Sequence, residues 1–296
     1  MSREDDLAMA YAAVRSRLTR VAYTILGSYT DAEDAVSDTW LRLAAADIRD
    51  PVRDVEAWAV VAVARTAVDV LRSTRMRRET YVGPWLPEPI VERLPSGVNP
   101  AEQVSHNDAV SYALLVVLES LTPAERIAFV LHDLFAMPFQ EVAKLVGRST
   151  EAVRKLASRA RNHVRADASR LEVDAEQHRR TVVAFMAAAA GGDLDRLVSL
   201  LDQSVVATCD GGGIISAARH PVKGRDKVAR YVFGLVEMLT PGQRLEFVFV
   251  NSILGNASYN NGILDSVTSF TTARGRVIRI DIIRAPDKLK HAANRM

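Results

Sequence analysis

The chain has 296 residues, of which 48% are hydrophobic and 25% charged, and this composition excludes collagen, a coiled-coil rod and wholesale disorder. The 38 Lys and Arg residues nearly balance the 36 Asp and Glu residues, so any nucleic-acid surface must come from local clustering of charge. Aromatic residues make up only 6%, which argues against base-stacking platforms. Cys209 is the single cysteine, which excludes an intramolecular disulfide and a multi-cysteine zinc site.

The first residues are acidic, and no apolar segment of the kind found in a secretory signal follows them. The longest apolar run, 182–190, is shorter than the ~20 residues of a membrane-spanning helix. We therefore expect a cytoplasmic protein without a membrane partner. The histidines show no metal-ligand spacing, and neither a metal nor a cofactor is predicted.

Three helices are predicted in the first 80 residues. Apolar residues at steps of four and three predict a helix from Leu7 to Ile25 that stops at Gly27. Thr30-Asp31-Ala32-Glu33 has the form of a capping box and predicts the start of a second helix. A third helix should begin near Asp54. Its predicted buried residues are Ala57, Val61, Ala64, Val68 and Leu71.

The third helix also carries the first basic cluster. A tryptophan alone favours a core position, but Trp58 shares a stripe with Arg65 and Arg72, which favours a surface role. The helix then continues into Arg75, Arg77 and Arg78.

A Pro-rich linker is predicted at 81–105, because five of the 11 prolines lie between 84 and 100. Its apolar residues, such as Trp85 and Leu86, are unusual for a solvated tether. Part of the linker should therefore dock on a neighbouring surface.

Residues 106–171 predict a helix-turn-helix. A second capping box, 122–125, is followed by a short helix opened by Pro138, a stop at Gly147 and a basic helix capped by Ser149. A helix that enters the major groove needs hydrogen-bond donors on one side. A solvated amphipathic helix is the alternative. The outward residues of the basic helix are Arg154, Lys155, Ser158, Arg159, Arg161 and Arg165.

Residues 172–296 predict an α+β domain with a curved sheet. Helices are expected at 182–190 and 194–201, separated by two glycines and capped by Asp193. The remaining order is strand, helix, strand, strand, strand, at 205–208, 224–239, 245–251, 264–271 and 277–283. Alternation at Ile278, Ile280 and Ile282 predicts one apolar face.

The order of these parts resembles the extracytoplasmic-function (ECF) class of bacterial sigma factors over residues 1 to about 170. Residues 31–42, Asp-Ala-Glu-Asp-Ala-Val-Ser-Asp-Thr-Trp-Leu-Arg, look like the family's acidic helix that clamps the β′ subunit of core RNA polymerase. An acidic first turn that satisfies a helix dipole would explain Asp31 and Glu33 but not Asp38. The polymerase-binding residues that the resemblance implies are Asp31, Glu33, Asp34, Asp38 and Arg42.

Residues 57–78 are similar to the family's minus-ten reader, and residues 121–161 resemble its minus-thirty-five reader. Core RNA polymerase, through its β′ and β subunits, and promoter DNA are therefore the expected partners. The implied DNA-binding residues are Arg65, Arg72, Arg75, Arg77, Arg78, Arg154, Lys155, Ser158, Arg159 and Arg161.

Three further motifs resemble a sigma-factor subgroup with a fused SnoaL-like domain: Trp85-Leu86-Pro87-Glu88-Pro89, Asp210-Gly211-Gly212-Gly213 and Pro286-Asp287-Lys288-Leu289. Ala285 departs from the subgroup's Asn. In the glycine motif, positive φ angles would let another segment approach closely, although a plain hairpin turn is an equal alternative. The resemblance implies that this domain regulates the sigma factor in place of a separate anti-sigma protein. The implied regulatory contacts are Trp85, Leu86, Pro87, Asp210, Gly211, Gly212, Gly213, Asp287 and Lys288.

The sequence thus predicts a multidomain chain: an all-α sigma domain at 1–80, the linker at 81–105, an all-α helix-turn-helix sigma domain at 106–171 and an α+β cone at 172–296. The rival interpretation is a helix-turn-helix regulator fused to a SnoaL-like domain that binds small molecules or acts as a cyclase or isomerase. The candidate acids and bases of such an enzyme show no recognisable catalytic spacing, so we do not expect an enzyme. They are Asp210, His220, Asp226, Asp265 and Asp281.

Overall fold

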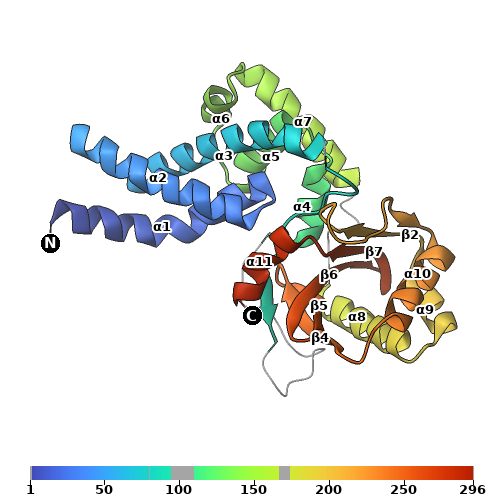
Figure 1. Ribbon diagram of the computed structural model, residues 1–296. Helices are drawn as coiled ribbons and strands as arrows, with labels where there is room; N and C mark the ends of the chain where they lie inside the picture. The colour runs from blue at the N-terminus through green and yellow to red at the C-terminus, as the bar shows by residue number, and fades with distance from the viewer. Residues whose placement is uncertain (1, 80, 95–109, 167–173, 296) are drawn as a thin grey trace. The chain divides into compact units, whose positions relative to one another are not determined.

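The computed structural model describes residues 2–79, 81–94, 110–166 and 174–295, except for the side chains of 74–79, 294 and 295 (Figure 1). The chain forms two compact units, Met1–Glu79 with Val117–Ala166 and Thr80–Val116 with Asp167–Met296. The division falls within helix α4 (Tyr112–Glu119). The described part of the predicted linker, 81–94, falls in the second unit. In the described residues, no helix has the length and apolarity needed to span a membrane.

The first unit is helical. After α1, α2 and α3 come α5, a π-helical turn η2, α6 and α7. Their bounds are Arg3–Leu26, Tyr29–Arg49, Val55–Glu79, Pro123–Phe129, Val130–Leu134, Phe139–Val146 and Thr150–Ala166.

The ends of α1 and α2 lie close together in the sequence. Gly27 ends α1 in the left-handed conformation, with φ 67°, as predicted. Helix α2 begins at Tyr29, and the side chain of Ser28 accepts the N–H of Asp31 at 3.1 Å. The prediction that Thr30 caps this helix is therefore wrong. Ser28 directly follows the left-handed glycine, so it already holds the extended conformation that an N-cap needs.

Helix α3 buries a different stripe from the predicted one. Ala64, Val68 and Leu71 are buried as expected, but Ala57 is exposed and Val61 is only half-buried. Apolar residues occupy every position from 57 to 64, so periodicity alone could not choose the face. The additional buried positions are Ala59, Val63 and Ala67.

Arg126 joins parts of the first unit that are distant in sequence. The predicted capping box at Thr122 and Glu125 opens α5, as expected. One turn on, Arg126 is only 2% exposed, and it donates to the carbonyls of Ile25 at 3.0 Å and Leu118 at 2.9 Å. These carbonyls lie near the ends of α1 and α4, where no intrahelical donor is available. The two helical regions therefore share one interior.

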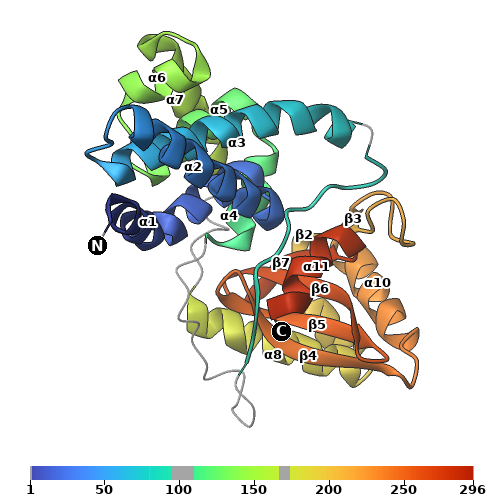
Figure 2. The same cartoon turned by 60° about the vertical axis from the view of Figure 1, so that its left-hand side comes forward.

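The second unit is built on a seven-stranded sheet in the order β1-β4-β5-β6-β7-β2-β3. Among the described strands, β2 and β7 pair in parallel and the other pairs are antiparallel. Figure 2 shows α8 on one face of the sheet and α11 on the other. The strands β1 to β7 are Val91–Arg93, Leu201–Asp210, Val222–Lys223, Gln243–Val250, Ile253–Asn260, Ile263–Ala273 and Arg276–Ile283. The helices α8 to α11 are Ala175–Ala190, Leu194–Leu200, Arg225–Glu237 and Pro286–Arg295.

Four elements of this unit were not predicted: β1, β3, β5 and α11. Strand β1 comes from the Pro-rich segment and pairs antiparallel with β4, so this segment does dock on a neighbouring surface. The predicted apolar face of β7 is confirmed at Ile280 and Ile282, which lie in the core, whereas Ile278 is only half-buried. Asp281 on the opposite face is buried as well.

Candidate functional site

The basic helix α7 presents polar side chains on one side and packs on the other. Val153, Leu156 and Ala160 are buried, as predicted. The side chain of Ser149 accepts the N–H of Ala152, and Gly147 ends α6 with φ 69°. The residues that the sequence singled out and that are exposed are Arg154, Lys155, Ser158, Arg159 and Arg165.

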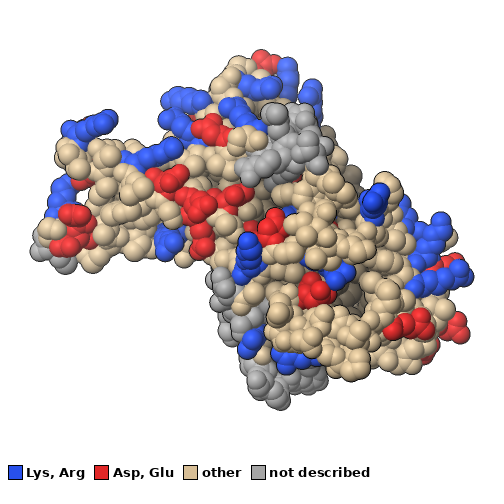
Figure 3. Space-filling model, in the orientation of Figure 1, with Lys and Arg blue, Asp and Glu red and all other residues tan. Residues whose placement is uncertain are grey.

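These exposed cations have few competing partners. Lys155 pairs with Glu151 at 2.7 Å, but both side chains are more than two-thirds exposed, and such pairs contribute little. The guanidinium of Arg154 lies 5.6 Å from the ring centre of Phe139. Arg161 differs, because it is half-buried and pairs with Asp133 at 2.9 Å. Figure 3 shows basic side chains gathered over α6 and α7 at the top of the view.

Helix α3 carries the other predicted DNA-binding residues. Arg65 and Arg72 are exposed, and Trp58 is half-buried. Arg72 donates to the carbonyl of Val146, the last residue of α6, at 3.2 Å. Arg75, Arg77 and Arg78 lie on α3, but their side chains are outside the described part of the chain.

The acidic helix α2 exposes two carboxylates one turn apart. Asp34 and Asp38 are exposed, whereas Asp31 and Glu33 are half-buried. Arg42 is exposed and donates to the hydroxyl of Thr66 on α3 at 3.2 Å. The exposed pair is therefore Asp34 and Asp38, which both lie beyond the first turn of α2, where Asp31 is the acidic residue.

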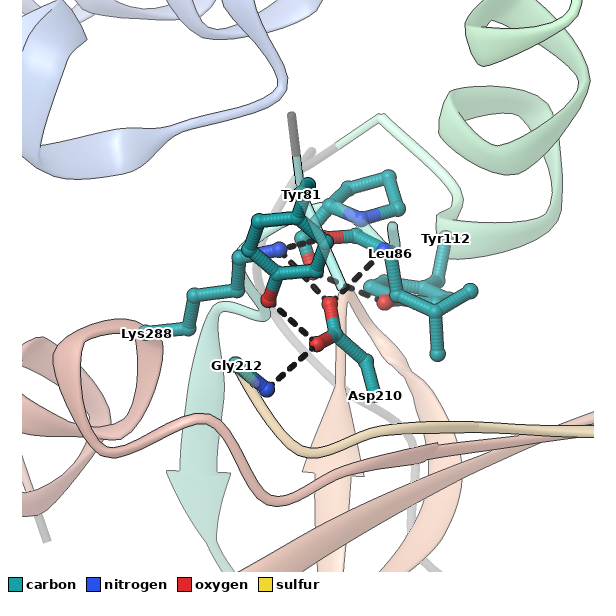
Figure 4. Close-up of polar contacts among 7 residues, drawn as sticks. Tyr81, Leu86, Tyr112, Asp210, Gly212 and Lys288 are labelled. Atoms are coloured by element: carbon teal, nitrogen blue, oxygen red, sulfur yellow. Dashed lines mark hydrogen bonds and ion pairs between the residues drawn. The ribbon is translucent and has the colours of Figure 1, made fainter. Parts of the chain in front are cut away.

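In the second unit, Asp210 holds the Pro-rich segment (Figure 4). Its carboxylate is fully buried and accepts hydrogen bonds from the hydroxyl of Tyr81 at 2.5 Å and the N–H of Leu86 at 2.8 Å. The N–H of Gly212 donates to the same group at 3.0 Å. Burial raises the pKa of Tyr81, and the hydrogen bond and negative charge of Asp210 raise it further.

Lys288 completes this contact from α11. Its ammonium lies 2.7 Å from Asp210 and donates to the carbonyl of Leu86 at 2.6 Å. It also lies 3.3 Å from the ring centre of Trp85, a cation–π contact. We call Tyr81, Trp85, Leu86, Asp210 and Lys288 the linker clamp. It brings together the three motifs that the sequence singled out.

The glycines beside Asp210 make room for neighbouring segments. Gly212 and Gly213 both have φ 70°, as their motif predicted. A Cβ on Gly213 would lie 3.2 Å from Cβ of Val82, and one on Gly211 would lie 2.2 Å from the carbonyl oxygen of Ile215. The segment that approaches Gly213 is the chain's own linker.

Sequence reasoning missed two residues that hold the same segment. Asn251 accepts the N–H of Ile90 at 3.0 Å and donates to the carbonyl of Val110 at 2.8 Å. Tyr112 donates to the carbonyl of Pro87 at 2.8 Å. Asn251 has φ 48°, a conformation that asparagine tolerates better than most residues, but this tendency is too common to identify a site. Asp287, a predicted regulatory contact, is exposed.

The candidate acids and bases of the rival interpretation are dispersed. Asp210 and Asp281 are buried and paired with Lys288 and Arg279 respectively, and burial raises the pKa of Asp281. Asp265 pairs with Arg284 at 3.1 Å. His220 and Asp226 are exposed. In the described ranges, no three His, Cys, Asp or Glu side chains gather as a metal site would require.

An acidic helix, a basic helix that follows a turn and a SnoaL-like α+β cone together have the organisation of a sigma factor with a fused C-terminal domain. Residues 10–77 match the family "Sigma-70 region 2", and residues 111–164 match "Sigma-70, region 4".

Relatives that align over nearly their whole length indicate which group of sigma factors the chain belongs to. The chain is 41% identical over 290 residues to the ECF RNA polymerase sigma factor SigJ of Mycobacterium tuberculosis. That alignment covers 94% of this chain and 91% of SigJ. It is 31% identical to the probable ECF sigma factor SigI of the same species, over 98% of this chain and 97% of SigI. The crystal structure of M. tuberculosis SigJ matches with a TM-score of 0.73 at 37% identity and covers 94% of this chain and 96% of SigJ. The chain therefore belongs to the ECF sigma factors.

Proposed function

We propose that this chain, in the cytoplasm, binds core RNA polymerase and directs it to promoters whose minus-thirty-five element is read by α7 and whose minus-ten element is read by α3. The observation that carries this proposal is the exposed face of α7. Arg154, Lys155 and Arg159 project from a helix that is held by a buried stripe and a Gly147 turn. Phosphate contacts would supply most of the affinity, and Arg154, Lys155 and Ser158 would contact base edges.

The polymerase contact is proposed at Asp34 and Asp38. Both carboxylates are exposed, lie one turn apart on α2 and face the same side of the helix. A basic surface on the polymerase β′ subunit is the complementary partner.

Run-off transcription with purified core polymerase tests the proposal. The double variant Arg154→Ala/Lys155→Ala should lose transcription that depends on the minus-thirty-five sequence. Arg180→Ala/Arg230→Ala is the matched control, because both arginines are exposed and Arg180 pairs with Glu176 as Lys155 does with Glu151. Equal promoter selectivity in the two folded variants would refute the assignment of α7.

We also propose that the second unit modulates the sigma regions through the linker clamp. The clamped residues 81–94 lie in sequence between the region 2 match and the region 4 match. On a promoter, the two elements lie about 80 Å apart, at 3.4 Å per base pair. A compact unit of this length has a diameter of about 35 Å. Regions 2 and 4 must therefore separate, and a linker held on the second unit restricts how far they can move.

Covalent linkage supports this regulation, because it raises the effective concentration of the second unit near the sigma regions to about the millimolar range. Under this proposal a separate anti-sigma protein is not required. Removing residues 172–296 would uncover Leu86, Ile90 and Val91, all buried in the second unit, so point variants are the cleaner test.

Lys288→Met removes the positive charge that pairs with Asp210, and Trp85→Ala removes the aromatic ring that lies against the ammonium group of Lys288. Lys290→Met is the matched control, because Lys290 is exposed on the same helix. Transcription by the two clamp variants should differ from that of the parent and the control in one run-off assay. Four equal outputs would end the regulatory proposal and leave the sigma function intact.

A further inference from the structure

A cavity of about 490 Å³ lies in the second unit between the sheet and helices α8 and α10. This volume is within the range of small-molecule sites, about 300 to 1,000 Å³. The helix side of the cavity and one end of the sheet are apolar. The buried apolar residues in contact with it include Phe185, Val232, Phe270, Ile280 and Ile282.

The opposite part of the wall is polar, although it is buried. Asn256 and Ser258 on β5 and Ser266 and Thr268 on β6 line the cavity, and each is between 5% and 8% exposed. Asn256 pairs across the sheet with Thr268, and Ser258 pairs with Ser266. Because alternate residues of a strand share a face, these four side chains form one patch. We call it the polar patch.

The polar patch has unused hydrogen-bonding capacity. Within the described part of the chain, no hydrogen bond engages any of its four side chains. None of its polar atoms is fully enclosed by protein, because the four side chains line the cavity and are open to water-sized molecules there. Oxygen atoms of a ligand can replace that water, so the patch is suited to partners that enter the cavity.

The charges at the cavity are already balanced. Asp265 and Arg284 line it and bind each other at 3.1 and 3.2 Å, and Arg284 also donates to the carbonyl of Ser216 at 3.1 Å. An ionised ligand would have to compete with this pair. The mouth is apolar, because Met238 and Leu245 line the cavity and are 67% and 37% exposed.

We propose that this cavity binds an uncharged, mostly apolar small molecule that carries hydroxyl or carbonyl oxygens along one edge. The apolar body lies against Phe185, Val232 and Phe270, and its oxygens bind the polar patch. This site is separate from the promoter and polymerase surfaces and from the linker clamp, so it does not depend on the proposed function.

The neutral fluorophore 6-propionyl-2-dimethylaminonaphthalene has this chemistry and is the probe. Its analogue 2-dimethylaminonaphthalene lacks the carbonyl. The full-length protein should bind the carbonyl probe saturably, at one site per chain and at least fivefold more tightly than the analogue. Thr268→Val and Asn256→Leu should each remove most of this preference while leaving the affinity for the analogue within twofold.

Thr271→Val is the matched control, because Thr271 is a buried threonine of the same strand that does not line the cavity. It should keep the full preference. Cys209, the only thiol, lines the cavity, so the bound probe should also slow its alkylation by iodoacetamide at least threefold. The proposal is overturned if the protein does not bind the probe, if it binds both compounds equally, or if Thr271→Val loses the preference as Thr268→Val does.

Discussion

The basic face of α7 and the linker clamp use the same kinds of side chain in opposite ways. On α7, Arg154, Lys155 and Arg159 are exposed to water. In the clamp, Lys288 and Asp210 are 5% and 0% exposed, and each binds the other and Leu86. An exposed cation keeps its hydration and can exchange it for a phosphate, whereas a buried pair is already committed to its own chain.

This difference in burial predicts which substitutions affect the stability of the fold and which affect binding to a partner. Removing an exposed charge usually changes the unfolding free energy by less than about 0.5 kcal/mol. Removing one member of a buried ion pair leaves the other charge buried without a counter-charge, and this lowers the unfolding free energy much more. Substitutions of the same type in the two regions should therefore give opposite results in a stability assay and a promoter-binding assay.

The largest expected effect is on the clamp. Lys288→Met leaves Asp210 buried and unpaired, and should lower the unfolding free energy of the second unit by about 3 to 5 kcal/mol in urea denaturation. Adding Asp210→Asn to that variant should restore part of the loss, because the stranded charge is then gone. Lys290→Met should change stability by less than about 0.5 kcal/mol. Equal stability of the two lysine variants would show that the clamp charge is not buried in solution.

The next effect is on α2. Asp34→Lys/Asp38→Lys reverses both exposed charges and should abolish co-purification with core polymerase, with a change of less than about 1 kcal/mol in unfolding free energy. Asp195→Lys/Glu237→Lys, which reverses two exposed acids of the second unit, is the control for net charge. Retained binding by the α2 variant would leave its acidic residues with a capping role only.

The helices show which features a sequence can predict. For α1, α5 and α7, the apolar period and the cap residues are local, so Gly27, Thr122 and Ser149 mark their ends correctly. The Ser28 cap was missed because Thr30 offers the same hydroxyl two residues later.

Strand β1 and the clamp depend on contacts that are distant in sequence. Val91 pairs with Val250, and Leu86 with Asp210, so the prolines nearby suggest only a linker until the partners are known. Strand β5 was missed for a related reason. Asn256 and Ser258 face a cavity, so the strand lacks the apolar alternation that marks a buried strand. The three motifs of the clamp were found by resemblance, but the fact that they meet at one carboxylate is a property of the fold.

A smaller effect should distinguish phosphate contacts from base contacts on α7. If Arg159 contacts a phosphate, Arg159→Ala should weaken the binding of holoenzyme to all promoter sequences about equally. It should also reduce the slope of log affinity against log salt concentration by about 1. Arg154→Ala should instead reduce discrimination at one base pair, by about 1 to 3 kcal/mol. An unchanged salt slope for Arg159→Ala would place that residue outside the interface.

The smallest expected effect is a pH dependence of stability, and it should distinguish a buried histidine, His178, from an exposed one, His163. His178 is 1% exposed; Nε2–H donates to the carbonyl of Leu254 at 2.8 Å, and Nδ1 accepts the hydroxyl of Thr272 at 2.9 Å. Burial lowers the pKa of His178, and the hydrogen bond to Leu254 opposes this only in part. The unfolded chain, with an ordinary histidine pKa of about 6.5, therefore takes up a proton before the folded chain does. The unfolding free energy should fall as the pH drops through that value, and the fall should continue until the folded-state pKa is reached.

Urea denaturation at pH 7.5 and 5.5 measures this fall. It should be smaller in His178→Gln and unchanged in His163→Gln, because His163 is exposed on α7. An identical fall in His178→Gln and the parent protein would assign the pH dependence to other groups.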